Sequence, residues 1–391
     1  MKQHEAVAWV IYPADDESGS PARLELEALE LEPCQAGEVL AEPVYGCWEG
    51  NMGHAISRQP LDVCRQRGEP KVVIGNAGVV RILEAGPEVR VVEPGQYAMV
   101  FPSAAEDRWG YTVKALGYDA AGQSGMLATR VKLSARQLIP LPENTRYSLA
   151  QWAAFSVRYV TAWSNWRMAY GVFRLQVDAD ECPSPHVWGW GGGTTLAELD
   201  LARRHGCRVA MLSGGEQNLR LIERTGIAAI DRRRFGKLSY DEALYASDRV
   251  FRAAYRRAET AFLNEVRQQT GGDMVQIFID YLGGPVYRAT LKALSREGVI
   301  ATAGWKRGME MSHLRSKECI ARHQHVYTHY ARYSEGVEAV RYAEANGWMP
   351  EVDARVYSFE EVPQLAQDYA DEKTGYFPCY ALNLRMGATG A

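Results

Sequence analysis

The pattern of apolar and polar positions changes once along the chain. Up to about residue 165, short apolar runs are separated by Gly and Pro, as in KVVIGNAGVVRILEAG (71–86) and VVEPGQYAMVFPSA (91–104). Such runs are typical of strands joined by tight turns. The stretch YSLAQWAAFSVRYVTAWSNWRMAY (147–170) then predicts a helix with large apolar side chains. The first part of the sequence therefore predicts a small β-rich domain that leads into a helix.

From residue 185 onward, apolar runs alternate with helical patterns. We predict strands at 186–190, 207–212, 228–232, 275–281, 299–305 and 325–330, and helices at 192–205, 216–225, 241–269, 285–296, 314–322 and 334–347. The long helix is supported by apolar positions that recur at spacings of three, four and seven residues. Six strands alternating with helices predict an α/β fold with a doubly wound parallel sheet.

These patterns divide the chain into three parts. Residues 1–165 form the predicted β-rich domain, and residues 166–350 form the predicted doubly wound domain. The remaining segment, 351–391, reads as strand, helix and strand, and it is too short to fold alone. We therefore expect this segment to return to the first domain.

Composition and charge narrow the function classes. A net charge of -4 and a sequence pI of about 6.1 argue against general nucleic-acid binding, which usually needs a basic face. The run Arg232, Arg233 and Arg234 is short enough to be a solvated loop. No stretch reaches the ~18 apolar residues of a membrane helix. The seven cysteines are scattered without a CxxC pair, so we expect a reduced, cytoplasmic protein without structural metal.

The segment VWGWGGGTTLAELDL (187–201) places four glycines between a predicted strand and a predicted helix. In the dinucleotide fingerprint G-x-G-x-x-G, glycines permit a tight turn and a close approach to the pyrophosphate. Gly189, Gly191, Gly192 and Gly193 fill the first part of the fingerprint, and Thr194 stands at the third glycine position. The strand–turn–helix context favours dinucleotide binding over a purely structural turn. Thr194 offers a hydroxyl donor to phosphate at some cost in helix–strand distance.

The end of the second strand of this domain discriminates between the two nicotinamide cofactors. A carboxylate there accepts from the ribose 2′-hydroxyl of NAD and repels a 2′-phosphate. This chain has Ser213, Gly214 and Gly215 at that position, followed by Arg220 one turn into the next helix. The sequence therefore favours NADP(H), with Arg220 as either a phosphate partner or a solvated surface residue.

The order of these parts resembles the medium-chain dehydrogenase/reductase superfamily over nearly the whole chain. The segments that carry the resemblance are AGEVL (36–40), VVIGNAGVVRILEAGPEVRVVEPGQYAMV (72–100), TAW (161–163) and FIDYLGGPVYRATLKALSREGVIATAG (278–304). The resemblance implies a GroES-like β-rich catalytic domain joined to a Rossmann domain with a doubly wound parallel sheet.

The zinc ligands of the superfamily are missing from this sequence. Zinc-dependent members carry a Cys after the first strand–turn segment and a Gly-His-Glu further on. Here the Cys position reads Trp48, with Cys47 one residue early, and the His and Glu positions read Asn76 and Ala77. Zn²⁺ prefers thiolate, imidazole or carboxylate ligands. We therefore expect a zinc-free enzyme of the reductase branch, which includes quinone and enoyl reductases.

A finer resemblance is to the crotonyl-CoA carboxylase/reductase group. It rests on RWGYTVKALGYDAAGQSGMLATRVKLSARQLIPLP (108–142), the inserted helix at 241–269 and SKECIARHQHVYTHYARYSEG (316–336). Family members have a Trp-Gly-aromatic-Glu segment and a Ser-His-aromatic segment whose His helps to hold CO2. The first reads Trp109-Gly110-Tyr111-Thr112 here, so the Glu is lost, whereas the second keeps its His as His329. The family's carboxamide position reads Tyr45 or Gly46, so carboxylation is doubtful and plain reduction is favoured.

The resemblance implies hydride transfer from NADPH to the β-carbon of an activated C=C bond, followed by protonation of the α-carbon. The predicted proton donors are His329, Tyr111 and Tyr45, with Trp109 beside them. Thr161 and Gly304 match family positions near the nicotinamide. Each of these residues also has an ordinary structural interpretation.

Three functions stay open from the sequence. The first is an NADPH-dependent reductase of 2,3-enoyl thioesters bound to CoA or a carrier protein. The second is a zinc-free reductase of free quinones or enones, and the third is a cofactor-binding protein without turnover. The superfamily often pairs its last Rossmann strand across a dimer, so we also expect a homodimer.

Overall fold

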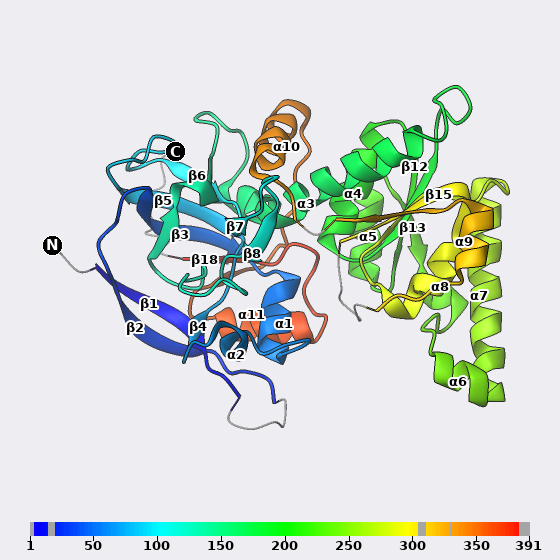
Figure 1. Cartoon of the computed structure of the whole chain (residues 1–391), viewed down its shortest axis with the longest axis horizontal. Helices are drawn as coiled ribbons and strands as arrows, with labels where there is room; N and C mark the ends of the chain where they lie inside the picture. Colours follow the sequence, from blue (N-terminus) through cyan, green and yellow to red (C-terminus); the bar gives the residue numbers. More distant parts are fainter. Residues whose placement is uncertain (1–3, 15–19, 304–309, 329, 383–391) are drawn as a thin grey trace. The chain divides into compact units, whose positions relative to one another are not determined.

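The structure is a computed structural model that describes residues 4–14, 20–303, 310–328 and 330–382 (Figure 1). The chain divides into two compact units. The first unit joins Met1–Val160 with Arg332–Ala391, and the second is Thr161–Ala331. The helix at 334–347, which the sequence pattern assigned to the doubly wound domain, is thus counted with the first unit.

The first unit is built mainly from antiparallel strands. Its described strands form a seven-stranded sheet of order β10-β6-β5-β3-β18-β17 with β9 added on β3, a three-stranded sheet of order β2-β1-β4, and the β7–β8 hairpin. The strands are β1 (His4–Ile11), β2 (Glu25–Leu31), β3 (Glu38–Cys47), β4 (Val72–Val73), β5 (Gly78–Ala85), β6 (Tyr97–Val100), β7 (Ser103–Glu106), β8 (Thr112–Ala115), β9 (Val131–Ser134), β10 (Leu138–Pro140), β17 (Val356–Ser358) and β18 (Cys379–Ala381).

Helices close this unit and connect it to the rest of the chain. They are α1 (Gly50–Ser57), α2 (Val63–Arg67), the 3-10 turn η1 (Ala135–Gln137), the first part of α3 (Leu149–Arg174), α10 (Tyr333–Asn346) and α11 (Val362–Ala370). The tail reads strand, helix and strand, as the sequence predicts. Its last strand, β18, pairs antiparallel with β3, where Cys379 stands opposite Cys47. The C-terminal segment therefore completes the sheet of the first unit.

The second unit contains a six-stranded parallel sheet. Its order is β13-β12-β11-β14-β15-β16, so the chain winds outward in both directions from the centre. The strands are β11 (His186–Trp190), β12 (Arg208–Ser213), β13 (Ala228–Asp231), β14 (Val275–Asp280), β15 (Leu294–Thr302) and β16 (Gln324–Tyr327). The prediction of an α/β fold with a doubly wound parallel sheet is confirmed. In such sheets ligands bind where the winding reverses, at the carboxyl ends of the strands.

The helices of the second unit follow the predicted alternation with two differences. They are α4 (Gly193–Arg204), α5 (Glu216–Arg224), η2 (Arg232–Phe235), α6 (Glu242–Ser247), α7 (Arg249–Thr270), α8 (Gly284–Ala293) and α9 (Arg315–Ala321). The single helix predicted at 241–269 is wrong, because the chain breaks at Asp248. The Asp248 side chain accepts from the amides of Val250 and Phe251, and so begins a new helix. Helix α8 also ends three residues before the predicted position.

Tryptophans of the glycine-rich segment belong to the core of the second unit. Trp188 and Trp190 are buried, and the ring of Trp190 packs against Phe262 of α7 at 5.3 Å and Phe278 of β14 at 5.1 Å. This contact packs α7 against the sheet at Trp190, the residue before Gly191 of the glycine turn. The turn is thereby held on a well-packed strand, as burial of aromatic surface favours.

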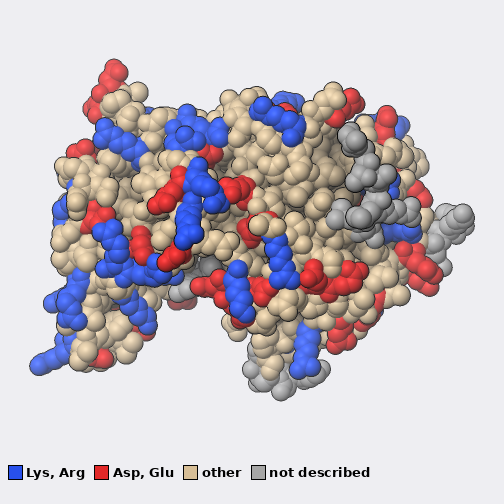
Figure 2. Space-filling view, turned by 180° about the vertical axis from the view of Figure 1, so that it is seen from behind, with Lys and Arg blue, Asp and Glu red and all other residues tan. Residues whose placement is uncertain are grey.

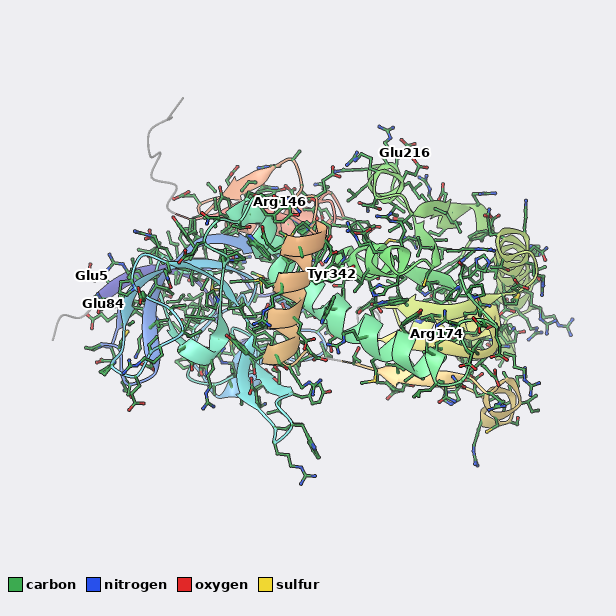
Figure 3. All side chains as sticks on the ribbon, turned by 90° about the horizontal axis from the view of Figure 1, so that it is seen from above. Glu5, Glu84, Arg146, Arg174, Glu216 and Tyr342 are labelled. Carbon is green, nitrogen blue, oxygen red and sulfur yellow. The ribbon has the colours of Figure 1, made fainter. Side chains whose placement is uncertain are left out.

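Hydrogen bonds from the end of α3 hold the loop that leads into β11. Arg174, which Figure 3 labels, donates to the carbonyl oxygens of Val177, Asp178 and Cys182. These bonds satisfy loop carbonyls that no strand pairs with. The strand that carries the glycine turn is therefore reached through a fixed connection.

Charged side chains of both signs are intermingled on the face shown in Figure 2. This distribution agrees with the small net charge of -4. None of the helices in the described part of the chain combines the length and the apolar character that a membrane crossing requires.

Candidate cofactor-binding site

The glycine turn lies between β11 and α4, where the winding of the sheet reverses. Gly192 is the residue before the helix, and a side-chain carbon built there would meet nothing within 4 Å. At Gly191, by contrast, such a carbon would lie 2.1 Å from Thr195 Oγ1 and 3.0 Å from Tyr281 Cβ. The turn is therefore closed toward the protein at Gly191 and open on its outer side at Gly192. An open helix start with free amide groups fits a phosphate.

The close helix–strand contact of the fingerprint falls on Thr195. This residue is fully buried, and its Oγ1 donates to the carbonyl oxygen of Trp190 at 3.4 Å. A side-chain carbon at Gly189 would lie 2.7 Å from Thr195 Cγ2, so Gly189 is needed for that packing. Thr194 is only half-buried, and Gly193 is the first residue of α4. The sequence places Thr194 at the third glycine position, and the role assigned to it stays a prediction.

A guanidinium from η2, which the sequence pattern assigned to a solvated loop, lies at the end of β12. A side-chain carbon at Gly214 would lie 2.7 Å from Arg232 Nε, so the Arg232 side chain lies directly over this glycine. Ser213 is buried at the end of the strand. Arg220 instead pairs with Glu216 at 3.4 Å, and both side chains are more than two-thirds exposed (Glu216 in Figure 3). Arg232 thus places a guanidinium at this strand end, where the sequence predicts the 2′-phosphate.

Four polar side chains from separate elements form a hydrogen-bonded network next to the glycine turn. Glu198 of α4 is completely buried, and its oxygens accept from Asn165 Nδ2 of α3 at 3.0 and 2.9 Å. The Tyr281 hydroxyl, just after β14, donates to Glu198 Oε2 at 2.9 Å. The Thr328 hydroxyl, just after β16, donates to Asn165 Oδ1. Burial raises the pKa of Glu198 to about 8, against the opposing effect of these hydrogen bonds.

This network is adjacent to the glycine turn. The amide of Tyr281 donates to the carbonyl oxygen of Trp190 at 3.2 Å, and the Tyr281 side chain limits the space at Gly191. Sequence reasoning missed Glu198, Asn165, Tyr281 and Thr328. A Glu on the inner side of an otherwise apolar helix start was the one available signal.

The predicted substrate residues of the first unit lie on two elements. Trp109 and Tyr111 are at the tip of the β7–β8 hairpin, where Asp107 Oδ1 accepts from both of their amides at 2.9 and 3.0 Å. Trp109 is 61% exposed, with the Arg108 guanidinium 3.8 Å from its ring, and the Tyr111 ring is contacted by Arg332 at 5.2 Å. Tyr45 is a half-buried residue of β3.

The three remaining predicted site residues have different outcomes. Thr161 is a half-buried residue of α3 at the start of the second unit. Gly304 and His329 lie outside the described residues. The roles assigned to these three residues stay predictions.

A buried ion pair lies beside Trp48, the residue that the sequence analysis placed at the position of a zinc-ligand Cys. Arg158 of α3 approaches Cys47 Sγ at 2.6 Å, the carbonyl oxygen of Trp48 at 2.6 Å and Glu49 Oε1 at 2.8 Å. Asn76 is also buried. Burial raises the pKa of Glu49, and the nearby Arg158 opposes this rise. Within the described ranges, no group of three or more His, Cys, Asp or Glu side chains could hold a metal ion.

Comparisons of sequence relate the chain to two curated proteins. It is 24% identical over 319 residues to a crotonyl-CoA reductase of Streptomyces avermitilis, covering 78% of this chain and 67% of that protein. It is 23% identical over 318 residues to a crotonyl-CoA reductase of Streptomyces collinus, covering 76% and 65%. The match thus spans about two thirds of the length of these relatives. No family model matches the chain.

Comparisons of structure relate nearly the whole chain to the same group of proteins. The crotonyl-CoA carboxylase/reductase AntE in complex with NADP superposes with a TM-score of 0.78 at 20% identity, covering 97% of this chain and 94% of that chain. The 2-octenoyl-CoA carboxylase reductase CinF, in complex with NADP and 2-octenoyl-CoA, gives 0.78 at 17% identity, covering 99% and 89%. The alcohol dehydrogenase of Aeropyrum pernix gives 0.75 at 17% identity, covering 96% and 99%. This chain therefore has the fold of the medium-chain dehydrogenase/reductase superfamily, within which it resembles the crotonyl-CoA carboxylase/reductases.

Proposed function

We propose that this protein is a zinc-free, NADP(H)-dependent oxidoreductase that reduces the C=C bond of a 2,3-enoyl thioester. The observation that carries the proposal is the turn after β11, which is closed at Gly191 and open at Gly192 at the reversal point of the sheet. A dinucleotide pyrophosphate fits such a turn. The resemblance to crotonyl-CoA reductases supports the choice of substrate class.

In this proposal the second unit holds the cofactor along the carboxyl edge of its sheet. The amides at the start of α4 bind the pyrophosphate, with Gly192 leaving room for it and Thr194 offering a hydroxyl. Ser213 and the Arg232 guanidinium bind the 2′-phosphate at the end of β12, where Ser213, Gly214 and Gly215 carry no carboxylate. Asp231, opposite Ser213 on β13, is paired with Arg233. The adenosine half thereby lies toward β12, and the nicotinamide half lies toward β14, β15 and β16.

The bound cofactor would supply a hydride to the β-carbon of the substrate. The protein's part is to stabilise the developing enolate with hydrogen-bond donors and to deliver a proton to the α-carbon. We assign these roles to His329, Tyr111 and Tyr45, with Trp109 bounding the site beside Tyr111. The Tyr111 hydroxyl donates without carrying a charge, and the contact of its ring with Arg332 fixes its orientation.

Reduction without carboxylation is the favoured outcome. The position of the CO2-holding Glu in the family's segment is Thr112, the first residue of β8, which is buried. Its Oγ1 has no hydrogen-bond partner among the described residues. A single neutral hydroxyl replaces a carboxylate there, so the set of groups that would hold CO2 is incomplete.

Oxidation of NADPH, followed by absorbance, tests the proposal. Crotonyl-CoA should be reduced at the same rate with and without bicarbonate, and the product should be butyryl-CoA. Faster turnover of a free enone such as 2-cyclohexen-1-one would instead indicate the small-molecule reductase. Measurable NADPH binding without turnover of either substrate would indicate a cofactor-binding protein.

A homodimer and a cytoplasmic location stay predictions. β16 is the edge strand of the parallel sheet, and Tyr327 in it is 60% exposed. An exposed edge strand can pair with a second copy of the chain. Light scattering of the purified protein would measure the mass directly.

A further inference from the structure

Glu198, Asn165 and Thr328 form a directed chain of hydrogen bonds. An ionised carboxylate can only accept hydrogen bonds, so it requires the NH2 group of Asn165 to face it. The Asn165 carbonyl oxygen must then face Thr328, and the Thr328 hydroxyl donates its one hydrogen to it. The Thr328 oxygen keeps lone pairs but has no further hydrogen, so toward any additional partner it can only accept.

Tyr281 reinforces this direction. Its hydroxyl donates to Glu198 Oε2 at 2.9 Å and lies 3.0 Å from Asn165 Nδ2, from which it accepts. With Glu198 ionised, every polar atom of the three buried side chains therefore has a partner. Buried networks that are completely satisfied specify a single arrangement.

Thr328 is the member of the chain that reaches the edge of the sheet. It is half-buried, whereas Glu198 and Asn165 are fully buried. Its amide donates to the carbonyl oxygen of Thr302 at the end of β15, at 3.0 Å. The buried Thr302 Oγ1 has no hydrogen-bond partner within the described ranges. Two hydroxyl groups are thus placed at the carboxyl ends of β15 and β16, on the side opposite β12.

We propose that Glu198 is a positioning residue for the cofactor: through Asn165 it keeps the Thr328 oxygen a hydrogen-bond acceptor for a donor on the nicotinamide riboside half. This inference rests on the proposed function, which places that half toward β14, β15 and β16. The donor is either the carboxamide NH2 or a ribose hydroxyl, since both are neutral donors on the same half of the molecule.

The network also couples cofactor binding to a proton. A proton on Glu198 turns one oxygen into a donor, and we infer that the Asn165 amide rotates so that its carbonyl oxygen accepts from it. The NH2 of Asn165 then faces Thr328, whose hydroxyl hydrogen is turned outward against the cofactor's donor. Tyr281 is the one titratable side chain in hydrogen-bond contact with Glu198 among the described residues, and its pKa is raised well above 10 by burial. Tyr281 therefore stays neutral, and Glu198 alone titrates.

NADPH should accordingly bind more tightly as Glu198 ionises, and its binding should release a proton. With the pKa of Glu198 near 8, the affinity of the wild-type protein should rise as the pH increases from 6.5 to 9. The two effects are linked by thermodynamic necessity. A purely structural carboxyl that ignores the cofactor would give neither.

The test measures the NADPH dissociation constant by calorimetry for four variants. Glu198→Gln supplies an amide, which no longer dictates the direction of Asn165, and Thr328→Val removes the hydroxyl. Each single variant should weaken NADPH binding about tenfold. Thr328→Val loses one hydrogen bond to the cofactor, and in Glu198→Gln the Thr328 hydroxyl can turn its hydrogen toward the cofactor's donor. The double variant should also lose about tenfold, because both changes break the same contact. Thr328→Ser keeps the hydroxyl and should bind NADPH as tightly as the wild type.

Further measurements separate this mechanism from a loss of folding. Glu259→Gln removes another buried carboxyl of the second unit, one paired with Lys292 on α8, and should leave the NADPH affinity unchanged. Calorimetry in two buffers with different ionisation heats should show proton release for the wild type and none for Glu198→Gln. The 3-acetylpyridine analogue of NADPH lacks the amide donor. If the analogue binds wild type and Thr328→Val equally, the donor is the carboxamide; a persisting tenfold loss assigns it to a ribose hydroxyl.

Three results would overturn the inference. These are an affinity of Glu198→Gln equal to that of the wild type, a hundredfold loss in the double variant, or pH-independent binding without proton release. Each can occur in a protein that binds and oxidises NADPH normally, in which case the proposed function stands and only the inference fails. A wild-type protein that binds neither NADPH nor NADH would contradict both the inference and the proposed function.

Discussion

Arg220 of α5, the helix after β12, and Arg232 of η2, the turn after β13, have different surroundings. Arg232 lies over the backbone of Gly214, whereas Arg220 is held in an exposed pair with Glu216. A charge-assisted bond to a phosphate is about twice as strong as a neutral hydrogen bond. We therefore predict that Arg232→Ala raises the dissociation constant for NADPH by about ten- to a hundredfold and leaves that for NADH unchanged.

Arg220→Ala is the matched control for this prediction, because it removes the same charge from the neighbouring helix. It should change NADPH affinity by less than about twofold, as expected for an exposed pair. Fluorescence titration with both cofactors measures the two variants. If Arg220→Ala lost the selectivity instead, the 2′-phosphate would lie along α5 and not over Gly214.

Glu198 also makes the stability of the protein depend on pH. Its pKa is about 8 in the folded chain, above the ordinary value of 4.5. Between these values the folded state binds more protons than the unfolded state, so the free energy of unfolding falls as the pH rises. Glu198→Gln removes this loss. We predict that the Tm of the variant relative to wild type increases by several degrees between pH 6 and pH 9, as measured by calorimetry without cofactor. A constant difference across that range would show that Glu198 does not titrate there.

Two glycines of the turn are needed for different reasons: Gly191 for the fold and Gly192 for the proposed ligand. Gly191→Ala would bring a methyl group within 2.1 Å of Thr195 Oγ1, so the strand–helix junction must shift. Gly192→Ala meets no protein atom within 4 Å but occupies the open side of the turn. We predict that Gly191→Ala lowers the Tm by several degrees, whereas Gly192→Ala keeps the Tm and weakens NADPH binding at least tenfold. Equal effects of the two variants on Tm would contradict this division.

At the scale of elements, apolar runs predicted most of the second unit. HVWGW and VQIFID are completely buried strands, and continuous apolar runs are what the centre of a parallel sheet requires. The break in the long helix was missed because apolar spacing continues across Asp248, where a local cap competes with helix propagation. The early end of α8 was missed for a related reason, since Leu294 suits either a helix or the strand that it begins.

The candidate site was less accessible to sequence reasoning than the strands were. The fingerprint located the turn, because its residues are consecutive and their spacing is set by the chain itself. Glu198, Asn165 and Thr328 are separated by up to 163 positions, and nothing in the sequence indicates that they touch. Arg232 was hidden for the opposite reason: it stands in a run of three arginines, of which Arg233 pairs with Asp231 at the surface. Contacts between elements decide such roles, and spacing alone does not report them.

At the scale of the whole molecule, the first unit is assembled from both ends of the sequence. β18 pairs with β3, and β3 ends at Cys47, where Arg158 of α3 contacts the strand end. Three segments that are far apart in the chain therefore meet at one buried point before α3 enters the second unit.

The buried Arg158–Glu49 pair should contribute measurably to the free energy of unfolding. Both groups are buried, at 2.8 Å, so removing one leaves the other charge uncompensated. We predict that Glu49→Gln lowers the free energy of unfolding by about 3 kcal/mol. Arg158→Met should cost less at low pH, because the pKa of Glu49 is raised by burial and the carboxyl can take up a proton. The double variant should lose clearly less than the sum, since no charge is then left unpaired. Urea denaturation of the four proteins at pH 6 and pH 8 measures this coupling, and strictly additive losses would show that the two groups are stabilised by other partners.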